Sequence, residues 1–401
     1  MKLSSMLVVA AVAAGSVSFL NVSPAPAAFE PAAQKAAPAP KIQVALLLDT
    51  SNSMDGLIDQ ARTQLWSIVN ELSAARHDGR PPTLEVALYE YGNNGLPAAE
   101  GYVRLVQPFT SDLDLLGEKL WSLKTNGGSE FCGTVIADAT QALNWDPADV
   151  IDGGADKNDH RPAVYRTIFI AGNEPFTQGE VDYRRAVPAA RGKGIVVNTI
   201  HCGSPADGES GEWMAGARLG GGEFLNIDQD RRTVVMATPF DEEITDLGRA
   251  VNTTYIGFGR RAEAAMELQT SQDKLAEANA DVGSAVQRAV AKSSALYDNR
   301  GWDLVDATKA GELELDNLDR TQLPEPLANL SDEELKAKVA KAAGERERIQ
   351  KRIAELQQQR AAFLAENQKP AEGEAATLDT AIVAAVRKQL AENGFDTPAA
   401  E

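Results

Sequence analysis

Oxygen-bearing side chains gather in one short stretch of the chain, LLLDTSNSMDG at residues 46–56. Asp49, Ser51 and Ser53 stand at alternate positions directly after a run of apolar residues. In an extended loop the two serine hydroxyls point the same way, and a carboxylate two residues earlier can hold a metal-bound water. Such an all-oxygen set suits a hard divalent cation, Mg²⁺, Ca²⁺ or Mn²⁺, rather than zinc. Alternatively these are turn and cap residues, because Ser53 is a good N-cap for a helix that begins at residue 54.

The elements that position this stretch follow from the alternation of apolar patterns. Strands are predicted at 41–48, 84–91, 102–109, 164–171, 194–201 and 223–227, and helices at 54–75, 111–124, 132–144, 179–191, 209–218 and 240–254. Residues 92–101 (GNNGLPAAEG) carry no helical pattern, so the second and third strands form a hairpin. The rest predicts an α/β fold: a doubly wound, mostly parallel six-stranded sheet with one antiparallel edge strand. Ligands of such sheets bind beyond the carboxyl ends of the strands, where Asp49 lies.

The strand pattern stops after residue 257, and long helices are predicted at 260–297 and 331–366. The second helix carries apolar residues at four-three spacing, interrupted by Arg346 and Arg360. Residues 258–370 are therefore expected to form a coiled-coil-like helical hairpin, with self-association through it as an alternative. Residues 371–401 are expected to be a flexible tail that contains one short helix, at 378–390.

Composition and the first residues bear on partners and compartment. A formal net charge of −19, from 39 basic and 58 acidic side chains, argues against nucleic acid as a partner. Residues 1–27 have the layout of a cleaved signal peptide, with an uncleaved anchor as the alternative, and residues 28–40 form an Ala/Pro-rich flexible leader. We therefore expect a periplasmic or secreted protein with no membrane span after cleavage.

The sequence DTSNS matches the DxSxS signature of von Willebrand factor type A (vWA) domains, and residues 41–257 resemble that family. In the family this loop forms the metal-ion-dependent adhesion site (MIDAS). The resemblance implies a Rossmann-like fold and a bound divalent cation, with Mg²⁺ first and Ca²⁺ or Mn²⁺ as alternatives. It also implies that Asp49, Ser51 and Ser53 are joined at the cation by side chains from two further loops.

The two further loops depart from the family pattern. In the second, TNGGSEFCGT at 125–134, Ser129 stands where the family has threonine, and Thr134 is the alternative. The third lacks the family's aspartate; Asn173 and Glu174 are the candidate oxygen donors there, with water as the alternative. A cation that carries less protein charge is a stronger electrophile toward an incoming carboxylate, which is how adhesion-type domains bind an acidic side chain of a partner.

No nucleophile elbow, P-loop or dinucleotide-binding turn occurs, so the chain is not expected to be an enzyme. The predicted function is an exported, metal-dependent protein-binding module whose cation coordinates a carboxylate of a protein ligand. One alternative is a structural envelope scaffold whose helical tail drives assembly and whose vWA domain has no metal function. Another is a hydrolase that uses the cation as a Lewis acid, which would need a general base that the sequence does not offer.

The chain has two cysteines, Cys132 and Cys202, and export would place both in an oxidising compartment. The loop before Cys132 and the end of the strand before Cys202 are expected at the same carboxyl edge of the sheet. The sequence therefore predicts a disulfide between them, which would tether the loop of Ser129. Two separately buried thiols are the alternative.

Overall fold

The computed structural model describes residues 39–147, 164–228, 236–279, 283–367 and 377–397. The predicted signal peptide and nearly all of the predicted leader lie outside these ranges. Within them, no helix is both long enough and apolar enough to cross a bilayer.

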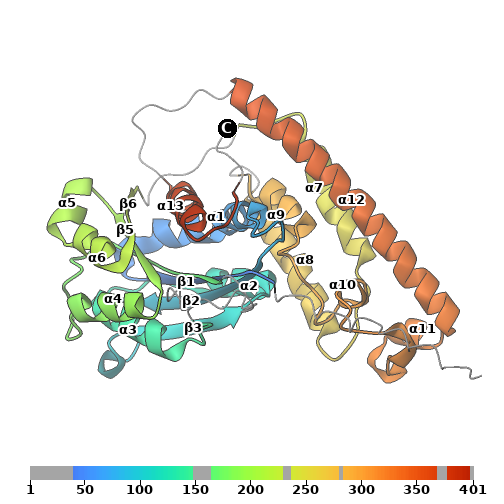
Figure 1. Cartoon of the computed structure of the whole chain (residues 1–401), viewed down its shortest axis with the longest axis horizontal. Helices are drawn as coiled ribbons and strands as arrows, with labels where there is room; N and C mark the ends of the chain where they lie inside the picture. Colours follow the sequence, from blue (N-terminus) through green and yellow to red (C-terminus); the bar gives the residue numbers. More distant parts are fainter. Residues whose placement is uncertain (1–38, 148–163, 229–235, 280–282, 368–376, 398–401) are drawn as a thin grey trace, which may run out of the picture. The chain divides into compact units, whose positions relative to one another are not determined.

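A six-stranded sheet forms the centre of the fold (Figure 1). Its strands are β1 (Lys41–Asp49), β2 (Thr83–Tyr91), β3 (Val103–Thr110), β4 (Val164–Gly172), β5 (Val196–Cys202) and β6 (Gly221–Ile227). They lie in the order β3-β2-β1-β4-β5-β6, and only the β2–β3 pair is antiparallel. The predicted mostly parallel sheet with one antiparallel edge strand is thus confirmed.

Helices cover both faces of this sheet because alternate side chains of β1 point to opposite sides. The helices of this part are α1 (Asp55–Ala74), α2 (Leu113–Ser122), α3 (Cys132–Ala142), α4 (Tyr183–Gly192), α5 (Pro205–Ser210), α6 (Trp213–Gly220) and α7 (Asp241–Ala250). Leu46 and Leu48 share one apolar core with α1 and α2, whereas Leu47 shares the other with α3 and α4. β1 is therefore buried on both faces, as its continuous apolar run predicts.

A C-terminal helical region follows, as predicted. It contains α8 (Ala262–Ala278), α9 (Ser284–Ser293), α10 (Leu304–Lys309), α11 (Glu325–Ala328), α12 (Asp332–Asn367) and α13 (Leu378–Glu392). The five 3₁₀ turns that the structure describes are η1 (Asn52–Met54), η2 (Ala98–Glu100), η3 (Val251–Thr254), η5 (Leu315–Asn317) and η6 (Arg320–Gln322). The helix expected at 260–297 is divided into α8 and α9, and Gly283 before α9 has a left-handed φ of 74°.

The long helix α12 packs against α7, η3 and α10 as well as α9, so it contacts the sheet domain's own last helix. The two arginines that interrupt its apolar stripe are buried ion-pair partners. Arg346 donates to Asp303 at 2.7 Å, and Arg360 donates to Asp241 at 2.8 Å. Apolar residues of the stripe, such as Ile353, are also buried within the chain. This stripe is therefore not free to pair with a second chain as a coiled coil.

The helix expected at 378–390 forms as α13, and it packs on α1 and β6 rather than standing apart. Its apolar residues belong to the same core as α1. Gln389 donates to the side chain of Asn198 on β5 at 2.6 Å, and Leu378 N donates to Gln60 of α1 at 2.8 Å. α13 thus completes one face of the sheet.

The predicted disulfide is wrong, because Cys132 and Cys202 are both free, buried thiols. Cys132 begins α3 and lies in the core on that face, close to the hydroxyl of Tyr91. Cys202 has the same parity along β5 as Ile200, and both face the opposite core, against α1. The sheet separates the two sulfur atoms, and the loop of Ser129 is not tethered by them.

A buried guanidinium joins four helices of the two parts. Arg288 on α9 donates to Asp114 of α2 at 2.7 Å and pairs with Asp273 of α8. Its guanidinium carbon lies 4.6 Å from the ring centroid of Trp66 on α1. Removing one partner of a buried pair leaves a charge without compensation.

We expect Arg288→Met to lower the free energy of unfolding by about 3–5 kcal/mol, because Asp114 would keep a buried charge without its partner. Urea denaturation measures this. Arg249→Met is the matched control, since Arg249 also pairs with two carboxylates but is exposed, and its removal should change little. Equal effects of the two substitutions would contradict a stabilising role for the buried pair.

Lys292 gives a pH-dependent prediction. It is 1% exposed beside Asp273 and Arg288, and burial lowers its pKa from 10.5 to about 8. Between pH 8 and 10.5, Lys292 binds more protons in the unfolded chain than in the folded one. Its contribution to the free energy of unfolding therefore rises with pH. As the pH rises from 8 to 10.5, the free energy of unfolding of the wild type should therefore increase by up to about 3 kcal/mol relative to that of Lys292→Met. A stability difference that stays constant with pH would contradict this.

Candidate metal site

The DTSNS loop lies at the carboxyl end of the central strand. Asp49 is the last residue of β1 and is fully buried. Its Oδ1 accepts a hydrogen bond from Ser51 N at 2.7 Å, and the hydroxyls of Ser51 and Ser53 are 3.1 Å apart. Met54, not Ser53, precedes α1, and no side chain caps that helix. The hydroxyls are therefore directed to each other rather than to the helix N-terminus.

Backbone hydrogen bonds join the second loop to the DTSNS loop and to the segment after β2. Asn126 N donates to Thr50 O at 2.9 Å, and Asn94 N donates to Gly127 O at 3.0 Å. Gly128 is needed here, because an added Cβ would lie 2.1 Å from the carbonyl oxygen of Gly92. The loop is thus held tightly against the end of β2.

This loop brings a glutamate to the site instead of the expected serine. Glu130 is 3% exposed, and its side chain lies beside that of Asp49: a Cβ added to Gly92 would lie 2.8 Å from Glu130 Cγ and 2.7 Å from Asp49 Oδ1. Ser129 is half-buried, and no hydrogen bond joins its side chain to these groups among the described residues. Thr134 lies in the first turn of α3 with its methyl group toward Gly101.

The third loop contributes one of its two candidate side chains. Asn173 Nδ2 donates to Ser53 Oγ at 3.1 Å, so Asn173 joins the cluster. The carboxylate of Glu174 is exposed and accepts a hydrogen bond from Gln178 at 3.1 Å. Only the backbone N of Glu174 reaches the site, where it donates to Glu130 Oε2 at 3.3 Å.

Two buried carboxyl groups therefore lie together, and no basic side chain among the described residues pairs with either. Burial raises the pKa of Asp49 well above its usual value, and the neighbouring Glu130 raises it further. Burial also raises the pKa of Glu130. Asp49 Oδ2 is buried and accepts no hydrogen bond. The other three buried carboxylates in the described part of the chain, those of Glu90, Asp114 and Asp303, each pair with an arginine.

The donor set fits a hard cation. Nowhere in the described ranges do three His, Cys, Asp or Glu side chains converge, so hydroxyl and amide oxygens would have to complete the coordination. Ser51, Ser53 and Asn173 supply them beside the two carboxyl groups, and Mg²⁺, Mn²⁺ and Ca²⁺ accept such ligands. Glu130 is the residue that sequence reasoning missed. Its signal is an acidic residue within a Gly-rich loop, directly before the apolar start of a helix.

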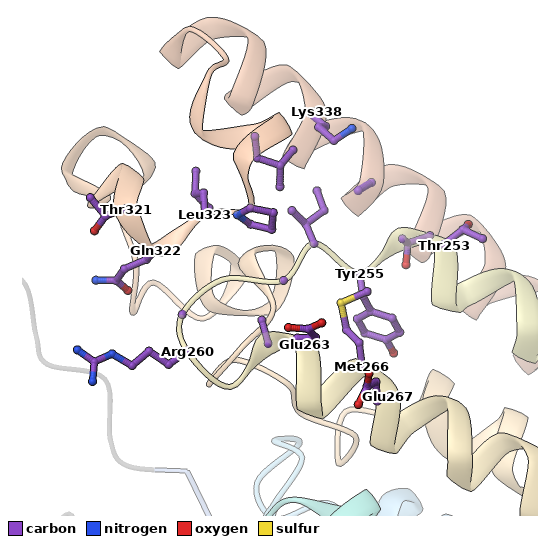
Figure 2. Close-up of a pocket in the computed structure, with 18 of the residues that line it drawn as sticks. Thr253, Tyr255, Arg260, Glu263, Met266, Glu267, Thr321, Gln322, Leu323 and Lys338 are labelled. Atoms are coloured by element: carbon purple, nitrogen blue, oxygen red, sulfur yellow. The ribbon is translucent and has the colours of Figure 1, made fainter.

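A separate groove of about 1530 Å³ lies in the helical region (Figure 2). Its walls come from η3, α8, η6, α11 and α12, and none of the DTSNS residues lines it. Met266 and Glu263 of α8 point into it across from Leu323 (Figure 2). Charged, polar and apolar side chains all line it.

Several solved structures are similar to this chain at low sequence identity. BatB from Bacteroides thetaiotaomicron is 20% identical over 47% of this chain and 90% of its own, with a TM-score of 0.33. An aerotolerance-related membrane protein from Bacteroides fragilis is 17% identical over 47% and 93%, with a TM-score of 0.31. The VWA domain of SpRpn10 is 14% identical over 47% and 88%, with a TM-score of 0.32. No protein-family model and no curated protein matches the sequence.

The assignment of the fold comes from the chain's own topology. The strand order, the single antiparallel edge strand and the helices on both faces define a doubly wound sheet. DTSNS stands at the carboxyl end of its central strand. The sheet and the helices on its two faces thus have a vWA-like fold, and a C-terminal helical region is present.

Proposed function

We propose that the protein is an exported, metal-dependent protein-binding module of the adhesion type. A divalent cation, Mg²⁺ first, is held at the DTSNS loop and coordinates a carboxylate of a protein partner in the periplasm or outside the cell. We propose a binder rather than an enzyme because the sequence contains no nucleophile elbow, P-loop or dinucleotide-binding turn.

One observation carries the cation. The carboxyl groups of Asp49 and Glu130 are buried side by side without a basic partner, while the buried carboxylates elsewhere in the described ranges are paired with arginine. An uncompensated buried charge is costly, so a site of this kind favours an ion that neutralises it.

The site is open to solvent on one side, which supports binding of a partner there. Asp49 and Glu130 form the buried floor, whereas Ser53 is exposed and Asn173 is half-exposed. When bound, the cation would offer an open coordination position at this rim to a carboxylate oxygen of the partner. The chain's residues would hold the ion from below and leave its outer side to the partner.

A second candidate is a structural envelope scaffold that needs no metal. The groove beside α12 favours it, because Lys338 and Lys341 on one wall and Glu263 and Glu267 on the other form no ion pairs among the described residues. Such side chains are available to another protein. Dependence on the cation separates the two candidates.

Mg²⁺ or Mn²⁺ should raise the melting temperature of the full chain, because a ligand that binds only the folded state stabilises it. The gain is about 2.7 kcal/mol when the ion is at about 100 times its Kd. The double variant Ser51→Ala, Ser53→Ala should lose this response in differential scanning fluorimetry. Ser73→Ala, which removes a hydroxyl bonded to Asn70 O on α1, should keep it. Identical responses of all three proteins would exclude the cation.

The immobilised protein should retain an envelope or secreted protein in Mg²⁺ and release it in EDTA, because the cation forms the contact. Mass spectrometry of the two eluates measures this, with the Ser51→Ala, Ser53→Ala variant as control. Retention that ignores EDTA but falls with Met266→Glu in the groove would instead support the scaffold.

A further inference from the structure

We infer that Glu130 is a direct ligand of the cation and supplies the acidic oxygen that the third loop lacks. This inference rests on the proposed function, because it names a ligand of the same site. The chain's sequence has Asn173 and Glu174 where the third loop would offer a carboxylate. The structure turns Glu174 toward Gln178 and places Glu130 next to Asp49, on the same side of Gly92.

The position of Glu130 is fixed by the backbone around it. Its N donates to Gln178 Oε1 at 3.2 Å, and its Oε2 accepts from Glu174 N at 3.3 Å. A Cβ added to Gly92 would lie 2.8 Å from Glu130 Cγ and 2.7 Å from Asp49 Oδ1. Glycine at position 92 is therefore what lets the two carboxyl groups meet below the surface.

The unpartnered oxygen of Asp49 points independently to a missing ligand. Asp49 is fully buried, yet its Oδ2 accepts no hydrogen bond. A buried oxygen without a hydrogen-bond partner is costly. A divalent ion would neutralise both carboxylates, and the hydroxyls of Ser51 and Ser53 would serve as neutral oxygen ligands beside them.

The matched control is a neighbouring buried acid with a different environment. Glu90 is 2% exposed and accepts a hydrogen bond from Thr50 of the same loop at 3.3 Å. It pairs with Arg104. Its charge is therefore already compensated, and we expect no contact with the ion.

The experiment is calorimetric titration of Mn²⁺, Mg²⁺ and Ca²⁺ into the full chain, its Glu130→Gln variant and its Glu90→Gln variant. Loss of a charged ligand weakens binding of hard cations. Glu130→Gln should raise the Kd at least tenfold, and Glu90→Gln should leave it within about twofold. Glu130→Asp, which keeps the charge on a shorter side chain, should recover part of the affinity.

A melting curve without metal separates loss of a ligand from loss of folding. Glu130→Gln removes a like charge beside Asp49, so its metal-free melting temperature should equal or exceed that of the wild type. Wild-type affinity in Glu130→Gln would overturn this inference and leave the proposed cation standing. Absence of ion binding by the wild type would overturn both.

Discussion

The structure depends on one constraint: the charge of a carboxylate buried in a folded chain is costly unless it is compensated. Because β1 is covered on both faces, Asp49 cannot turn its side chain to water. The DTSNS loop, the second loop and glycines 92 and 128 are arranged so that Glu130, Ser51 and Ser53 meet it there. The two glycines matter because any side chain at either position would push the loops apart.

The same constraint, met with arginine, joins the C-terminal helices to the sheet domain. Arg288 satisfies Asp114, and Arg346 satisfies Asp303 while it also donates to Thr254 O at 2.8 Å. These ion pairs fix the positions of α9 and α12 more specifically than apolar packing alone would. The helical region is therefore packed directly against the domain that holds the DTSNS loop.

The strands and most of the helices could be predicted because their signals are local: period-two and period-3.6 apolar patterns lie within each element. What the sequence did not reveal depends on contacts between distant residues. Glu130 looks like a spacer until the fold places it beside Asp49, and Arg346 looks like an interruption of a stripe until Asp303 appears opposite it. The disulfide prediction failed because it did not consider which face of the sheet each sulfur atom lies on. Cys202 faces the same core as Ile200, whereas Cys132 lies in the core on the opposite face.

The place of α13 sets the order in which this protein can fold. Leu378 bonds Gln60 across 318 positions of sequence, and Gln389 bonds Asn198 across 191. The apolar face of the sheet beneath α13 stays uncovered until those late residues have been synthesised. Closing this face therefore requires contacts between residues far apart in the sequence, which form more slowly than contacts between neighbours.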